Sequence, residues 1–518
     1  VKRTSGAAAN FLWDNSSYIL GVSLKKGEDD AEREKRRNKD IKCFEACREL
    51  HHSMLDGMEY PAAKAVLNFL DKWEPQKAEE NNLVAQYAKE ILSGANMVFR
   101  FNGGYVHDDP QLASVWQKAN AKQKDNIGQC LVTGALDEIQ NTHPTIKGVQ
   151  GAQSSGAALV SFNASAFCSY NKEQNQNAPV GKYAAFAYTT ALNHLLADRK
   201  NVHRIGDASV VCWAENADKQ YEDFAAEVFF GDNVDKSDEQ RLSALRTSLK
   251  LLADGLPCKE MDLDPDRKFY ILGLSPNAAR IAVRFFYCDS FGKIAGNIYK
   301  HHERLEIVRP SYDKFPILPL WKLLSATVNP NAKDKTPNAA MAGAVARAVF
   351  SGGRYPASLL ECTFLRIKAE RNITRERAAI IKAYYLRNPN EKCPKEVLTV
   401  SLNENSKNIP YTLGRLFSVY EEIQQAANPG INTTIKDRYF GSAAAMPATV
   451  FPILSNLAQK HLRKLSDAQR VYLDKKVMTL KSVLGEQYPA HMSLPEQGSF
   501  DLGYYHQTQA RYTKKEDK

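Results

Sequence analysis

The sequence has no long hydrophobic run. No window approaches the ~18 consecutive apolar residues of a membrane-spanning helix, so we expect a soluble protein with no membrane partner. The opening segment VKRTSGAAANFLWDN also lacks the apolar core and the small-residue cleavage site of a secretory signal peptide. Because the chain begins with Val1 rather than Met, we expect it to start inside a longer natural protein, with an N-terminal segment missing.

Cysteine is scarce as well, with nine residues in 518. The number is odd, the chain is long, and several cysteines lie in apolar runs that resemble strands. These features do not fit the disulfide framework of a small secreted domain. We therefore expect reduced, buried thiols and a cytoplasmic protein.

Catalytic motifs are also lacking. The sequence contains no P-loop, no H-E-x-x-H and no G-x-S-x-G motif. The acidic segments at 262–268 and 301–306 do not have the spacing of a nuclease or phosphotransfer site. We expect no enzymatic activity and no catalytic residue, with a metal-dependent nuclease as the alternative.

One group of residues has the chemistry of metal ligands. Cys43, Cys47, His51 and His52 follow helical spacing, so three of them could share a face and hold a metal ion. Zinc sites usually draw their ligands from two separate elements, and no second Cys or His cluster lies nearby in the sequence. Buried packing is the alternative, and we expect neither a metal nor another cofactor.

Positive charge is present in excess, and it is unevenly distributed. From Pro337 to the end, 26 Lys and Arg stand against 16 Asp and Glu, a net charge of +10 that equals the net charge of the whole chain. The preceding residues are therefore neutral overall. Such asymmetry indicates a polyanionic partner, and nucleic acid is the simplest one.

The spacing of apolar residues changes at the same place. Before residue 330 we expect helices over 28–55 and 181–196, a strand closed by a Gly-Gly turn within 95–109, and strands over 157–162, 208–214 and 279–289. After residue 337 the spacing is helical almost throughout, over 339–350, 358–372, 374–388, 411–427, 448–465 and 467–485. The sequence thus predicts an α+β fold, with a mixed α/β region over 1–330 followed by an all-α helical bundle over 337–518.

The segment SYNKEQNQNAPV (169–180) contains five Asn or Gln among twelve residues, directly before a predicted helix. Amides pair donors with acceptors as base edges do, and they are not drawn strongly to phosphate. A self-capping polar loop is the alternative. Amides also bracket the aromatic residues near the N-terminus. Our candidates for contacts to duplex DNA are Asn10, Asn15, Gln174, Asn175 and Asn177.

Three long strings carry a family resemblance: SFNASAFCSYNKEQNQNAPVGKYAAFAYTTALNHLL, HRIGDASVVCWAEN and FYILGLSPNAARIAVRFFYCDSFG. Together with NFLWDNSSYILG and the helical last third, in the same order, they resemble the large subunit of the subtype I-C CRISPR Cascade, the Csd1-type family. The resemblance covers essentially the whole chain. The resemblance implies a further N-terminal segment in that family, which we expect this chain to lack.

The resemblance implies a subunit of a crRNA-guided complex in antiviral defence. Its partners would be crRNA, the backbone, crRNA-end-binding and small subunits of Cascade, and a helicase-nuclease. The large subunit would read the protospacer-adjacent motif (PAM) in double-stranded target DNA, aid strand separation and stabilise the R-loop, while the guide reads the sequence. The resemblance also implies that residues 397–518 can be made separately as a small subunit.

In that setting the basic bundle would hold the displaced single strand through its phosphates, with binding that falls steeply with salt. The candidate contacts are Arg366, Lys368, Arg371, Arg375, Arg377, Lys460, Arg463, Lys464, Lys475 and Lys476.

Overall fold

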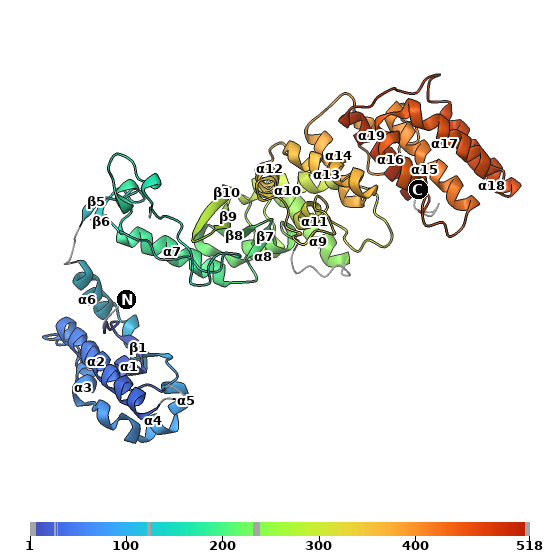
Figure 1. The fold of residues 1–518 in the computed structure, drawn as a ribbon. Helices are drawn as coiled ribbons and strands as arrows, with labels where there is room; N and C mark the ends of the chain where they lie inside the picture. Colours follow the sequence, from blue (N-terminus) through green and yellow to red (C-terminus); the bar gives the residue numbers. More distant parts are fainter. Residues whose placement is uncertain are drawn as a thin grey trace. The chain divides into compact units, whose positions relative to one another are not determined.

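The computed structural model describes residues 7–24, 27, 29–121, 126–162, 164–231 and 239–512 (Figure 1). The chain divides into two compact units, Val1–Ile139 and Gln140–Lys518. The predicted α+β fold is confirmed, since short sheets and helices alternate in the first part and the described elements from α11 (Leu320–Ser325) onward are all helical. None of the described helices is long and apolar enough to cross a membrane.

The first unit combines helices with short paired strands. Its helices are α1 (Ser16–Ile19), α2 (Asp30–Leu55), α3 (Pro61–Lys72), α4 (Asn82–Gln86), α5 (Ala88–Ile91) and α6 (Pro110–Ala121). Its strands pair two by two: β1 (Trp13–Asn15) with β2 (Asn96–Val98), β3 (Arg100–Phe101) with β4 (Gly104–Tyr105), and β5 (Ile127–Gln129) with β6 (Leu136–Glu138).

Helix α2 organises this unit, and α1, α3 and α6 all contact it. Asp29 caps the helix by accepting a hydrogen bond from the Glu32 N–H at 2.7 Å. The N-terminal half of α2 is charged and exposed, whereas Phe44, Cys47 and Leu55 in the C-terminal half are buried in the core of the unit. The apolar face of one helix thus holds the unit together.

The second unit begins with α7 (Lys182–Ala197) and an antiparallel four-stranded sheet in the order β10-β9-β8-β7. The strands are β7 (His203–Ile205), β8 (Ala208–Ala214), β9 (Lys268–Asn277) and β10 (Arg280–Ser290). A β-bulge interrupts the register of β10 between Val283 and Phe285. The accompanying helices are α8 (Lys219–Val228), α9 (Glu239–Ala253) and α10 (Phe291–Leu305).

The two faces of this sheet are covered to different extents. On one face, Val210, Phe269 and Phe285 belong to the large core that includes α8, α10 and the helical bundle. On the other face, Leu192 and Leu196 of α7 share a smaller core with strand residues from β8, β9 and β10. Only part of the second face is therefore covered.

The helical bundle follows, with α12 (Ala339–Ser351), α13 (Ala357–Glu370), α14 (Arg375–Arg387), α15 (Ile409–Ala427), α16 (Ile435–Ala445), α17 (Pro447–Leu462), α18 (Asp467–Lys481) and α19 (Leu494–Ala510). Figure 1 shows α15 to α19 gathered at the C-terminal end of the second unit. Six of these helices match the predicted ranges within a few residues, whereas α16 and α19 were not predicted.

The closest helix contact in the bundle is between α15 and α19. A Cβ atom on Gly414 would lie 1.9 Å from the carbonyl oxygen of Phe500, and one on Gly503 would lie 2.1 Å from that of Tyr411. The two backbones therefore touch, and residues with a side chain cannot replace these glycines without moving the helices. The Tyr411 hydroxyl also contacts Nδ1 of His506 at 2.9 Å across the same contact.

The prediction of a strand over 157–162 is wrong. Ala157 and Ala158 make only isolated bridges, to Ile146 and Arg280, and the following residues leave the sheet. The strand that does pair with both β8 and β10 is β9, which was not predicted. Its apolar residues run almost without interruption because both of its faces are largely buried, so it lacks the alternation of a half-exposed strand.

We expect Gly414→Ala to destabilise the bundle by about 3 kcal/mol or more, at or above the upper end of overpacking costs, because the new methyl group meets backbone rather than a mobile side chain. Thermal unfolding followed by circular dichroism measures the change. Gly441→Ala in α16 is the matched control, since a Cβ atom there meets nothing within 4 Å. It should be neutral or stabilising, because alanine favours a helix over glycine. Equal melting temperatures for the two variants would contradict the close contact.

Candidate nucleic-acid interface

The amide-rich segment folds into a 3₁₀ turn, η4 (Gln174–Asn177), shortly before α7. Asn177 holds the turn from inside. Its Oδ1 accepts a hydrogen bond from the Ser169 N–H at 3.0 Å, and its Nδ2 donates to the carbonyl oxygens of Lys172 and Gln174, both at 3.0 Å. These three hydrogen bonds fix the loop at its two ends and match the self-capping alternative for this residue.

The other two candidate amides of the loop differ in exposure. Asn175 is only 2% exposed, and its Nδ2 has no hydrogen-bond partner within the described residues. Gln174 is exposed and has a positive φ of 45°. The loop thus presents Gln174 to solvent, while Asn175 and Asn177 face inward.

Exposed aromatic rings accompany Gln174. Tyr170, in the same loop, is 94% exposed, and Tyr183 and Phe186 of α7 are 73% and 62% exposed. Sequence reasoning missed them. The signal was present in KYAAFAYTTALNHLL, where apolar residues occur on every side of the helix although a helix covering a sheet buries only one face. The exposed amide and rings of this loop and of α7 are side chains suited to contacts with base edges and base faces.

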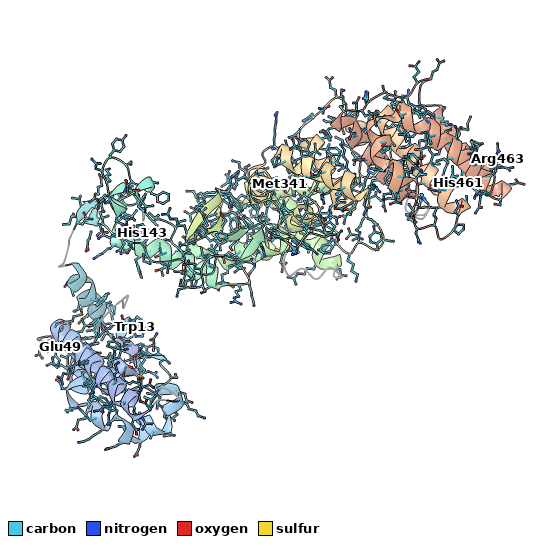
Figure 2. All side chains as sticks on the ribbon, viewed as in Figure 1. Trp13, Glu49, His143, Met341, His461 and Arg463 are labelled. Atoms are coloured by element: carbon cyan, nitrogen blue, oxygen red, sulfur yellow. The ribbon has the colours of Figure 1, made fainter. Side chains whose placement is uncertain are left out.

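The N-terminal candidates are held within the first unit. The backbone N–H of buried Asn10 donates to Asp14 Oδ2 at 2.9 Å. The half-buried Asn15 caps α1, because its Oδ1 accepts from the Ser17 N–H at 3.1 Å. The exposed side chain of this segment is Trp13 in β1 (Figure 2). In this segment Trp13 is thus exposed, whereas Asn10 is buried and the Asn15 side chain caps a helix.

His51 serves the fold rather than a cluster of metal ligands. Its Nδ1–H donates to the Cys47 carbonyl oxygen at 2.7 Å, and its Nε2 accepts from the Leu12 N–H at 3.0 Å. Burial lowers the pKa of His51 and keeps the ring neutral. His52 instead lies between Asp71 and Asp56, 2.8 Å from each, and hydrogen bonds to these carboxylates raise its pKa. Among the described residues, no three His, Cys, Asp or Glu side chains come together as a metal site.

Two of the candidate arginines are buried in structural contacts. Arg375 is 7% exposed and binds Asp313 at 3.0 Å together with the carbonyl oxygens of Phe315 and Pro316. Arg377, also buried, binds Glu370 at 2.6 Å. Both guanidinium groups hold neighbouring chain segments against α14, so neither is available to a phosphate.

The remaining candidates differ in exposure. Arg366 is half-buried with its guanidinium 3.6 Å from Glu370, and Lys476 is half-buried, 3.5 Å from Glu422 and above the ring of Tyr472. The exposed cations are Lys368, Arg371, Lys460, Arg463, Lys464 and Lys475.

Four of these exposed cations lie on or next to two consecutive helices. Lys460, Arg463 and Lys464 lie at the C-terminal end of α17, where Figure 2 labels Arg463, and Lys475 lies on α18. Lys475 shares an exposed stripe of α18 with Val471 and Met478. We call Lys460, Arg463, Lys464 and Lys475 the α17–α18 cations.

The chain matches a known protein family. A family model described as CRISPR-associated protein (Cas_Csd1) matches residues 1–512. No curated protein matches the chain. The family match gives no support for the expected missing N-terminal segment.

The two adjacent histidines of α2 are expected to affect the pH dependence of folding stability in opposite directions. The pKa of His51 is lowered in the folded chain, so as the pH falls this histidine is protonated in the unfolded chain before it is protonated in the folded chain. The contribution of His51 to stability is therefore complete above pH 6.5 and is lost as the pH falls towards its lowered pKa. The pKa of His52 is raised, so its contribution is present below pH 6.5 and lost as the pH rises.

We therefore expect His51→Asn to lose less stability than the parent between about pH 7.5 and about pH 5.5, and His52→Asn to lose more. Urea unfolding of the three proteins at both pH values measures the difference. The same pH dependence in both variants would contradict the two assigned environments.

Proposed function

The chain belongs to the Cas_Csd1 family of CRISPR-associated proteins, and from this premise we propose that it is the large subunit of a type I-C Cascade complex. In this role it recognises the PAM in duplex DNA, aids strand separation, stabilises the R-loop and presents the target to a helicase-nuclease. Its partners are crRNA, the other Cascade subunits, and the two strands of the target. It acts by binding and not by catalysis.

The observation that carries this proposal is the rigid loop that displays Gln174. A reader of a short DNA motif needs a neutral hydrogen-bonding group held at a fixed position, because discrimination between base edges depends on geometry. Asn177 supplies the support through its three hydrogen bonds, and Gln174 supplies the exposed amide. Tyr170 is an exposed ring in the same loop that could enter an opened base step.

The candidate amides thus take different parts in the proposal. Gln174 contacts the motif, and Asn177 is a positioning residue for it. Asn10, Asn15 and Asn175 face inward or cap local structure in the described chain, so their part would be to shape the surfaces around Trp13 and Gln174. Contact between duplex DNA and these three amides has no further support.

The α17–α18 cations support the second part of the proposal, the binding of the displaced strand. They are exposed, they lie on or beside two consecutive helices, and none has an ion-pair partner among the described residues. When cations of this kind bind the phosphates of a single strand, they release the counterions that were condensed on it. The range 397–518 contains α15 to α19 with the whole α15–α19 contact, which supports its separate production as a small subunit.

No observation favours the alternative of a metal-dependent nuclease. Within the described chain, the side chains that could bind a metal do not gather in threes. Metal analysis of the purified chain, with a cleavage assay in the presence of a chelator, separates the two functions.

We expect Gln174→Gly to reduce the preference of the crRNA-loaded complex for PAM-bearing over PAM-lacking duplex by about tenfold, because one amide contact to a base edge is lost. Glycine is chosen because it tolerates the positive φ at this position. The control is Asn171→Gly, which removes an exposed amide at φ 55° from the same loop. Filter binding to the two duplexes measures the ratio. An unchanged ratio in Gln174→Gly would refute the assignment of the loop.

The triple variant R463E/K464E/K475E should bind single-stranded DNA more weakly and with a salt dependence reduced by about 2 in log–log slope, since each phosphate contact on a single strand contributes about 0.7. Fluorescence anisotropy at several salt concentrations gives the slope. The matched control K35E/K39E/K42E reverses three exposed lysines of α2. If both triple variants change the slope equally, the α17–α18 cations have no special part in strand binding.

A further inference from the structure

Three aromatic rings form a column across the central sheet of the second unit. Trp213 of β8 lies opposite Tyr270 of β9 in the strand register, and their ring centroids are 5.3 Å apart with planes at 10°. Phe286 of β10 continues the series, 6.4 Å from Tyr270 at 25°. All three rings project from the sheet face that α7 covers in part. The rings therefore stand roughly parallel, one per strand, in an order that runs to the edge of the sheet.

The last ring of the column, Phe286, is exposed to solvent. Trp213 packs against the small core beneath α7, and Tyr270 is half-buried. β10 is the outermost strand, and Phe286 is 54% exposed. One face of the Phe286 ring stacks on Tyr270. The other face is accessible at the edge of the sheet.

Two exposed cations lie on the elements that contact β10. Arg347 of α12 is exposed and donates to the carbonyl oxygen of Arg284, two residues before Phe286 on the same strand, at 2.9 Å. Lys268 begins β9 on the same face as Tyr270, by the alternation of the strand. Neither Arg347 nor Lys268 has an ion-pair partner in the part of the chain that the structure describes.

Nearby acidic groups do not cancel these two charges. Asp207 binds Arg284 at 2.8 Å, and Asp289 binds Lys293 at 2.6 Å. Each carboxylate is thus neutralised by its own partner. Arg347 and Lys268 thus suit a ligand that combines a flat ring with negative neighbours.

We infer that the open face of Phe286 stacks an unpaired nucleobase of a single-stranded nucleic acid, which adds a fourth ring to the column. We assign phosphates of the same strand to Arg347 and Lys268. The site takes any base, because every base has a π-face and no amide or carboxylate of this column reads its edge. This inference rests on the proposed function, and it adds a stacking site outside both the loop at Gln174 and the α17–α18 cations.

The decisive experiment compares an intact strand with a strand that has phosphates but no bases. Fluorescein-labelled dT20 and a labelled abasic strand of the same length are titrated with the full chain, and anisotropy gives each Kd. We expect Phe286→Ala to weaken dT20 binding about fivefold or more and to leave abasic binding unchanged. Phe286→Tyr should restore dT20 binding because it keeps the ring. Val283→Ala, at an exposed aliphatic residue of the same strand, should leave both affinities unchanged.

The outcomes separate this inference from the proposed function. If the parent binds dT20 and Phe286→Ala binds it equally well, the stacking site is refuted while strand binding stands. A loss of affinity that is the same for both strands, or that Phe286→Tyr does not restore, also refutes stacking. If the parent binds neither strand, the proposed binding of the displaced strand fails. Where the parent binds dT20, a parallel titration with rU20 shows whether DNA or RNA is the preferred source of the base.

Discussion

A polar group that is buried in a protein has to find its partner within the protein, and this constraint decides which side chains remain for a ligand. The chain has many amides and cations, and the folded structure uses a large share of them. Asn177 closes its own loop, Asn15 caps a helix, and Arg375 and Arg377 hold chain segments against α14. The surface available to a ligand is what is left after these internal requirements are met.

The spacing of apolar residues located α2 and α7 to within two residues and the bulged edge strand β10 to within one. The short apolar run of β8 was located to the residue although nearly all of its residues are buried. The prediction failed for α19. α19 lies in the core from Gln497 to Gln507, so its sequence shows no polar face, and its glycines resemble breaks in a helix although they permit the contact with α15.

Composition indicated candidate surfaces but did not show which of their residues are exposed. The amide-rich segment and the basic last third were both visible in the sequence as local excesses of one kind of side chain. Which members are exposed depends on contacts with residues far away in the chain, such as Asp313 for Arg375. The aromatic residues Tyr170, Tyr183 and Phe186 were not among the candidates, although they face solvent.

The β-bulge in β10 has a consequence for the two phenylalanines beside it. Side chains alternate between the faces of a strand, so one inserted residue exchanges inside and outside for everything that follows. Because of the bulge, Phe285 packs its ring over Gly273 in the large core, and Phe286 points to the opposite face. In a regular strand the two rings would trade places. The extra residue at the bulge thus decides which of the two phenylalanines faces outward, and no preference of phenylalanine itself is involved.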